Sequence, residues 1–349
     1  MAVAKVLAIR GLTLIGVLFV VLLLVAVALG ATGYSDRMMN AIVNEELRGL
    51  RQALTQTIRD PDRLESVLQA RKQELIRFHG LDRPWYFRLP NMILRVLTLD
   101  LGEARTLRSF TGSSKVAEIV MERLSNTLLL VTTALAITAV IGLFVGVKTA
   151  TLAGGKIDRV ISYLSATSYA LPAWWTGILL ILVFSFGLHL LPSGGMYSAP
   201  PPTGSIGQSL DLLWHATLPI VTLVLVSVGG WIYSVRTMVL NTAQEDFVMV
   251  ARAKGLPEGL VMRRYILRVA ASPILTSLIL SLAGSIAGAI LTETVFNWPG
   301  MGRLYYDAIF APDETVVVAL TFMFTVIYVI ARFALEVLYI IIDPRVKYA

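Results

Sequence analysis

The residues whose spacing most clearly predicts a function lie in one polar stretch, residues 245–258. Asp246 suits the amino-terminal end of a helix and Lys254 suits the carboxyl-terminal end, because the helix dipole favours charges of those signs there. Gly255 can adopt the left-handed conformation that often follows a helix, and Pro257 is typical of the first position of the next one. The sequence therefore predicts a short helix, a sharp break and a second helix.

One face of the predicted short helix is apolar. Phe247, Val250 and Ala251 share a side with the stem of Lys254, because residues three and four apart are neighbours on a helix. The flanking sequence offers no obvious cover for this face, so a groove on a partner protein is the favoured cover. A helix lying on the lipid surface is the alternative.

Signatures of catalysis and of metal or nucleotide binding are missing from the sequence. There is no cysteine, the three histidines are far apart, and neither H-E-x-x-H nor G-x-S-x-G occurs. Residues 153–156 look like part of a P-loop, but Ala150 replaces its first glycine and Ile157 replaces the Ser or Thr that holds magnesium. The sequence therefore predicts that the chain is not itself an enzyme and has no catalytic residues, no metal site and no cofactor of its own.

The composition predicts a membrane protein. Of the 349 residues, 56% are hydrophobic and only 15% are charged, and the mean hydropathy is +0.72. A soluble protein of this length needs more charge to cover its surface. The net charge of +7 does not require a nucleic-acid partner, because membrane proteins keep Lys and Arg on the cytoplasmic side and become basic for that reason alone.

Six membrane-spanning helices are predicted. Five apolar stretches are long enough to cross a bilayer, namely 11–31, 128–147, 218–235, 270–291 and 316–342. A sixth region, 161–191, is interrupted by Pro172 and forms either one kinked span or two short ones. Two spans would place the Arg- and Lys-rich segment 236–269 outside, against the positive-inside rule, so one span is favoured. The fold is thus predicted to be all-α and polytopic, with both termini in the cytoplasm.

These spans divide the chain into three regions. Residues 1–31 form the amino-terminal end and the first span, whose apolar core is longer than that of a secretory signal peptide. Residues 32–125 form a helical outer segment, in which Asp60 and Pro61 mark a helix start. Apolar residues follow this start at helical spacing: Leu64, Val67, Leu68 and Leu75. Residues 126–349 form a five-helix core that contains the cytoplasmic loop at about 240–269.

Four residues are further candidates for a pathway or gate. Arg332 and Glu336 are ionisable residues well inside a span, and their i, i+4 spacing favours pairing on their own helix over a pathway role. Glu293 lies at the outer end of the fifth span, before a turn at 297–300 that contains Trp298. For Glu293, a role in gating or in ordering the turn and a solvated carboxylate at the helix end are both open.

Two pairs of glycines are spaced to allow close approach between membrane helices. Gly142 and Gly146 form one pair, and Gly284 and Gly288 form the other. Small residues at this spacing remove the side chains that would hold two helices apart. Packing within the chain is favoured over contact with another subunit.

Several motifs resemble those of the dipeptide/oligopeptide family of ABC-importer permeases. The stretch 251–256, following Asp246 and Phe247, resembles the family's coupling loop. Further similar stretches occur in the expected order: 80–84 and 100–102 in the outer segment, 122–128 before the second span, 293–302 after the fifth span, and Asp343, Pro344 and Arg345 near the end. Met249 and Val250 depart from the glutamate and alanine of the general importer motif.

The resemblance implies a permease subunit of an ATP-driven importer that moves peptides by alternating access across a prokaryotic cytoplasmic membrane. The implied partners are a second homologous permease, two ATPase subunits or domains that bind ATP and magnesium, an extracytoplasmic solute-binding protein and membrane lipid. The residues implied to couple to the ATPase are Asp246, Phe247, Val250, Ala251, Arg252, Lys254, Gly255, Leu256 and Pro257. Oligosaccharides and metal chelates are alternative cargoes. An ion-coupled secondary transporter is the alternative mechanism, which the scarcity of acidic residues inside the spans disfavours.

Overall fold

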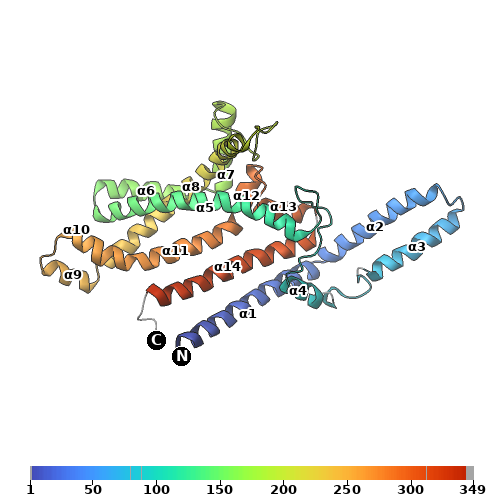
Figure 1. Cartoon of the computed structure of the whole chain (residues 1–349), viewed down its shortest axis with the longest axis horizontal. Helices are drawn as coiled ribbons and strands as arrows, with labels where there is room; N and C mark the ends of the chain where they lie inside the picture. Colours follow the sequence, from blue (N-terminus) through green and yellow to red (C-terminus); the bar gives the residue numbers. More distant parts are fainter. Residues whose placement is uncertain (1, 79, 88, 312, 343–349) are drawn as a thin grey trace. The chain divides into compact units, whose positions relative to one another are not determined.

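The computed structural model of the chain describes residues 2–78, 80–87, 89–311 and 313–342, and these residues are mostly helical (Figure 1). The α-helices are α1 (Ala2–Ala31), α2 (Tyr34–Thr55), α3 (Pro61–Phe78), α4 (Leu89–Leu97), α5 (Val116–Thr151), α6 (Lys156–Ala170), α7 (Ala173–Leu180), α8 (Ser205–Ala243), α9 (Asp246–Ala253), α10 (Glu258–Val261), α11 (Leu267–Gly288), α12 (Ile290–Val295), α13 (Met301–Phe310) and α14 (Glu314–Ile342). A short 3₁₀ helix covers Trp85–Phe87, and π-helices cover Ile181–Gly187 and Met262–Ile266. Within the described ranges, β pairing is limited to one bridge between Glu103 and Lys115. The all-α prediction is confirmed.

Five helical stretches of the described chain are long and apolar enough to cross a membrane, and the count reaches six if one bent pair forms a single span. The bent pair is Lys156–Ala170 with Ala173–Gly187, whose axes meet at 95°. The break lies at Pro172, as predicted. Leu171 is extended, with φ −83° and ψ 125°, because the proline ring disfavours helical backbone in the residue before it.

The chain divides into two compact units. The first comprises Met1–Leu12, Val120–Asp307 and Val326–Ala349, and the second comprises Thr13–Ile119 and Ala308–Thr325. Asp343, Pro344 and Arg345, which contribute one of the motifs above, lie outside the described residues.

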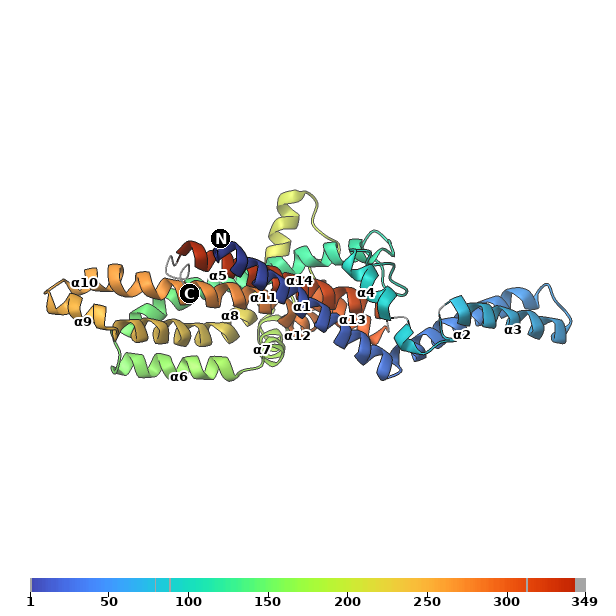
Figure 2. The same cartoon turned by 90° about the horizontal axis from the view of Figure 1, so that it is seen from below.

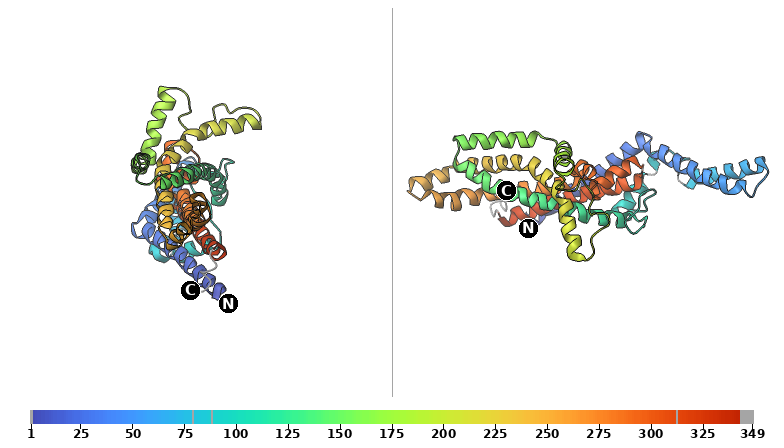
Figure 3. Two further views of the ribbon diagram at one scale, coloured as in Figure 1. Left: turned by 90° about the vertical axis from the view of Figure 1, so that its left-hand side faces the viewer. Right: turned by 90° about the horizontal axis from the view of Figure 1, so that it is seen from above.

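Close packing of helices organises the first unit. Helices α6 and α8 lie side by side (Figure 3), and a Cβ on Gly229 of α8 would come within 2.5 Å of the Ser165 carbonyl oxygen of α6. On α5, a Cβ on Gly142 would lie 1.9 Å from the Trp231 ring of α8. The first glycine pair therefore packs within the chain, as predicted.

The second glycine pair differs from the first. No heavy atom lies within 4 Å of where a Cβ on Gly284 would be, so Gly284 supports no close helix contact within the part of the chain that the structure describes. Its surroundings do not bear out the predicted packing within the chain. The sequence spacing of the two pairs is identical, so spacing alone does not distinguish Gly142, which faces a neighbouring helix, from Gly284, which faces none among the described residues.

In the second unit, α2 and α3 form an antiparallel hairpin (Figure 1). Helix α3 begins at Pro61, and the Asp60 carboxylate accepts a hydrogen bond from the Asp62 amide at 3.1 Å, which confirms the predicted helix start. Leu68 and Leu75 are buried, whereas Val67 is exposed. Ion pairs join the two helices at their exposed edges: Arg51 with Glu65 at 2.7 Å and Arg71 with Glu46 at 2.9 Å.

Candidate functional site

Helices α9 and α10 form the turn between the long helices α8 and α11 (Figure 2). Helix α9 ends at Ala253, and Gly255 follows in the left-handed region at φ 76°. The predicted order of short helix, break and second helix is confirmed. Pro257 precedes the first helical residue of α10, one position earlier than predicted, because its ψ of 137° is extended.

One side of α9 is anchored to the first unit itself. Val248 and Ala251 are 0% and 2% exposed, and they belong to an apolar cluster with Val239 of α8, Val261 of α10 and Ala270 of α11. The expectation that Ala251 shares a face left for a partner is therefore wrong. The reversal at Gly255 folds α10 back against α9 and supplies a cover that the sequence pattern did not reveal.

The other side of α9 carries apolar side chains that the described residues leave exposed. Phe247, Met249 and Val250 are 39%, 53% and 52% exposed, and the side chain of Lys254 is also exposed. Exposed apolar residues that cluster on one element are typical of an interaction surface. We call Phe247, Met249 and Val250 the α9 apolar face.

An ion pair braces the break between α9 and α10. Arg252 donates hydrogen bonds to the two carboxylate oxygens of Glu258 at 3.1 and 2.6 Å. The bond to Glu258 raises the pKa of Arg252 above its ordinary value. Both side chains are largely exposed, so water and salt screen their attraction, and the pair mainly holds the geometry of the break.

A second ion pair, which the sequence analysis did not identify, joins α6 to α8. The Arg236 guanidinium donates to both oxygens of Asp158 at 2.6 and 2.8 Å, and the Gly154 amide donates to the same carboxylate at 2.9 Å. The Asp158 side chain is 6% exposed and that of Arg236 is 20% exposed. In the sequence alone, Arg236 is one of the basic residues of segment 236–269, and residues 153–156 show only a partial likeness to a P-loop, so no local pattern indicates this pair.

Replacing Arg236 with alanine is expected to lower stability by about 1.5–3 kcal/mol, because the Asp158 carboxylate loses two charge-assisted hydrogen bonds. The melting temperature of the purified protein in detergent measures this change. The matched control is Arg159→Ala, which removes an exposed arginine from the same helix as Asp158 and should change the melting temperature little. Equal changes in melting temperature for the two variants would contradict a stabilising role of the ion pair between Arg236 and Asp158.

Glu293 of α12 is fully buried, at 0% exposed. Its carboxylate accepts a hydrogen bond from the Thr127 hydroxyl of α5 at 2.6 Å and one from the Arg303 amide of α13 at 3.0 Å. Burial, the largest influence, raises the pKa of Glu293, and the hydrogen bonds from Thr127 and the amides of Arg303 and Gly302 act in the opposite direction. The alternative of a solvated carboxylate at the helix end is therefore wrong, and Glu293 orders the turn.

The turn after Glu293 is tied to the start of the apolar part of α5. The Trp298 indole donates to the Asn126 carbonyl oxygen at 3.1 Å, and the Asn126 amide donates to the Pro299 carbonyl oxygen at 2.8 Å. Thr127 also accepts from the Met301 amide at 2.7 Å. Trp298 is fully buried, so in this conformation it is a packing residue. We call Glu293 and the residues that it orders, up to Arg303, the Glu293 turn.

Arg332 and Glu336 pair on their own helix. An Nη of Arg332 lies 3.7 Å from a carboxylate oxygen of Glu336, one turn later on α14. The predicted pairing is confirmed. Elsewhere in the described ranges, no three His, Cys, Asp or Glu side chains are grouped so that they could hold a metal ion.

Comparison with known proteins identifies relatives along most of the chain. Residues 110–348 match the family described as binding-protein-dependent transport system inner membrane component. The chain is 30% identical over 282 residues to the oligopeptide transport system permease protein AppB of Bacillus subtilis (strain 168), covering 81% of this chain and 87% of the relative. It is 31% identical over 283 residues to the di/tripeptide transport system permease protein DppB of Pseudomonas aeruginosa (strain UCBPP-PA14), covering 77% and 83%. It is 31% identical over 309 residues to the probable D,D-dipeptide transport system permease protein DdpB of Escherichia coli (strain K12), covering 82% and 88%.

Proposed function

Because the chain belongs to the binding-protein-dependent transport system inner membrane component family, we propose that it is the permease subunit of an ATP-driven importer of peptides. The relatives named for oligopeptide, di/tripeptide and D,D-dipeptide transport support peptides as the cargo class. The protein crosses the membrane several times. Its family implies a solute-binding protein and ATPase partners.

The α9 apolar face is the surface proposed to contact the ATPase. A short helix that keeps Val248 and Ala251 buried in its own chain can present Phe247, Met249 and Val250 to a groove without losing its own support. The residues proposed for this loop are Asp246, Phe247, Val250, Arg252, Lys254, Gly255, Leu256 and Pro257, with Ala251 as an anchor. Nucleotide and magnesium bind to the ATPase in this proposal, and two ATPase subunits or domains serve a pair of permeases.

The mechanism proposed is alternating access. Closure of the ATPase subunits on ATP moves α9, and the buried anchor of α9 passes this movement to the ends of α8 and α11. The Glu293 turn holds the start of the apolar part of α5 against α12 and α13 while these ends move. The outer segment, residues 32–125, is proposed to face the side from which the solute-binding protein delivers its cargo.

Uptake measurements distinguish this function from ion-coupled transport. The purified permease, reconstituted with its companion permease, ATPase and solute-binding protein, should accumulate a labelled di- or oligopeptide in vesicles only when ATP is supplied. An ion gradient without nucleotide should give no uptake. Uptake driven by the gradient alone would overturn the proposal.

The orientation proposed for the chain predicts which side a thiol reagent reaches. The sequence has no cysteine, so single cysteines can be introduced without background. A membrane-impermeant reagent should label Asp82→Cys in intact cells and should label Lys254→Cys only after permeabilisation. Labelling of Lys254→Cys from outside would contradict the proposed cytoplasmic position of α9.

A further inference from the structure

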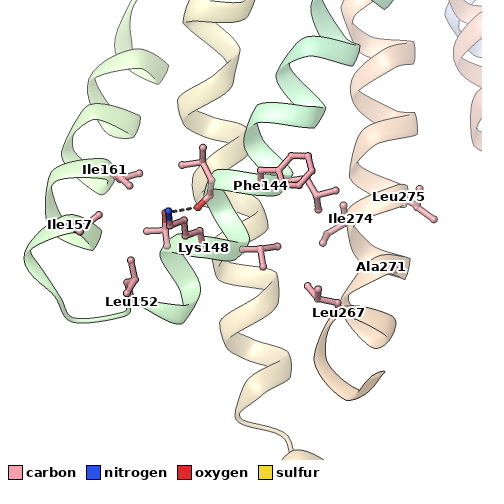
Figure 4. Close-up of a pocket in the computed structure, with 13 residues that line it drawn as sticks. Phe144, Lys148, Leu152, Ile157, Ile161, Leu267, Ala271, Ile274 and Leu275 are labelled. Carbon is pink, nitrogen blue, oxygen red and sulfur yellow. Dashed lines mark hydrogen bonds between the residues drawn. The ribbon is translucent and has the colours of Figure 1, made fainter. Parts of the chain in front are cut away.

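The first unit has an apolar groove whose walls are α5, α6 and α11 (Figure 4). Its volume is about 950 Å³. Representative wall residues are Phe144 of α5 and Leu152 directly after its end, Ile157 and Ile161 of α6, and Ala271 and Leu275 of α11. Because Phe144 and Ile157 are also largely exposed, the groove opens to the surroundings of the chain and does not belong to its closed core.

Basic groups accompany the apolar wall toward one end of the groove. Lys148 lines the groove from α5, one turn after Phe144 and one turn before Leu152. Arg268 lies at the start of α11, two helical turns before Leu275 and therefore on nearly the same stripe of that helix. Lys148 and Arg268 are both exposed. In Figure 4, the view places Leu152 and Leu267 at the same end of the groove.

The chemistry of the residues that line the groove favours some kinds of occupant over others. A peptide would bring many amide groups that need hydrogen-bond partners, whereas among the described residues that line the groove only Lys148 and Thr149 carry a polar side chain, and the Thr149 hydroxyl already donates to the Val145 carbonyl oxygen. A helix from another protein would fill the apolar part but would need its own acidic group to match Lys148 and Arg268. A phospholipid with an anionic headgroup supplies both an alkyl chain and the matching charge, and basic pockets between membrane helices are suited to such headgroups.

We propose that this groove binds one anionic phospholipid, whose acyl chain lies along α5 and α11 and whose phosphate contacts Lys148 and Arg268. The groove lies between α11, which follows the turn of α9 and α10, and the earlier helices α5 and α6. The lipid would therefore occupy a space whose width depends on the position of α11. The proposal requires a membrane-embedded chain. It does not require peptides as cargo or α9 as the ATPase contact, so its failure would leave the proposed function intact.

Fluorescence quenching by brominated lipids tests this proposal. A single cysteine, Leu275→Cys, is labelled with an environment-sensitive fluorophore in the assembled transporter, which is reconstituted in mixed vesicles of phosphatidylglycerol and phosphatidylcholine. Bromine is placed on the acyl chains of one lipid at a time. We expect phosphatidylglycerol to be enriched beside the label at least about fivefold over its bulk proportion, since each basic group near an anionic headgroup gives a preference of this order.

Two further variants make the result specific. The double variant Lys148→Gln and Arg268→Gln should return the quenching to the bulk lipid proportion, and the exchange Lys148→Arg with Arg268→Lys should retain the enrichment.

The matched control site is Leu225→Cys on α8, an exposed position with no Lys or Arg among its near neighbours in sequence, where both lipids should quench in proportion to their amounts. Proportional quenching at Leu275→Cys would mean ordinary contact with the bilayer, and absence of quenching by either lipid would mean that protein covers the groove. Either result would overturn the proposal.

Discussion

Replacing Glu293 with alanine is expected to destabilise the protein by about 3 kcal/mol or more. The substitution leaves the Thr127 hydroxyl and the Arg303 and Gly302 amides without their carboxylate acceptor, and each buried donor left unsatisfied costs about 1–3 kcal/mol. It also opens a space beside Gly300, where the carboxylate lies so close that a Cβ would come within 2.3 Å of it. The melting temperature in detergent and the yield of folded protein both measure the loss.

A second carboxylate nearby gives the matched control for this prediction. Asp307 lies 3.7 Å from Arg303, and its side chain is 43% exposed, so Asp307→Asn should cost about 1 kcal/mol or less. Glu293→Gln keeps the shape and one acceptor oxygen but turns an amide N–H₂ toward donors, so its loss should lie between the other two. If Glu293→Ala melted at the same temperature as Asp307→Asn, the ordering role of Glu293 would be excluded.

Replacing Gly255 with valine is expected to uncouple the permease from its ATPase while leaving membrane insertion unchanged. Gly255 has φ 76°, a region that costs an L-residue about 1–2 kcal/mol and a β-branched residue more. A strain of this size shifts the conformational population of the loop by roughly tenfold or more. Co-purification of the ATPase and ATP-dependent peptide uptake should both fall, whereas the amount of permease in the membrane should not.

Gly259 allows the strain to be separated from the added volume. No heavy atom lies within 4 Å of where a Cβ would be on Gly255 or on Gly259, but only Gly255 has a positive φ. Gly259→Val therefore adds the same side chain to the same loop without backbone strain, and it should keep both ATPase binding and uptake. Normal uptake by Gly255→Val, or equal losses in both variants, would count against a role for the left-handed turn.

Apolar runs and helix-end residues were enough to predict much of the fold. The spans, the break at Pro172, the helix start at Pro61 and the left-handed Gly255 all depend on local properties of the chain, namely hydropathy, ring geometry and the absence of a Cβ. The pairing of Arg332 with Glu336 was also predictable, because residues four apart on a helix are always neighbours.

Contacts between distant segments were not predictable from one sequence. Asp158 and Arg236 are 78 positions apart, and Thr127 and Glu293 are 166 apart, so no local pattern relates them. The same limit explains the error at Ala251, which was assigned to an open face. Its cover comes from residues beyond the turn, Val261 and Ile266, and only the folded arrangement brings them to it.

The burial of Val248 and Ala251 also has a mechanical meaning. A helix connected to the chain only at its two ends would move on flexible linkers. A force applied to it would then displace the linkers more than the neighbouring helices. Here Val248 and Ala251 of α9 instead pack into the same apolar cluster as residues of α8 and α11, which gives the connection lower compliance. In the proposed mechanism, a force applied to α9 would then reach α8 and α11 together.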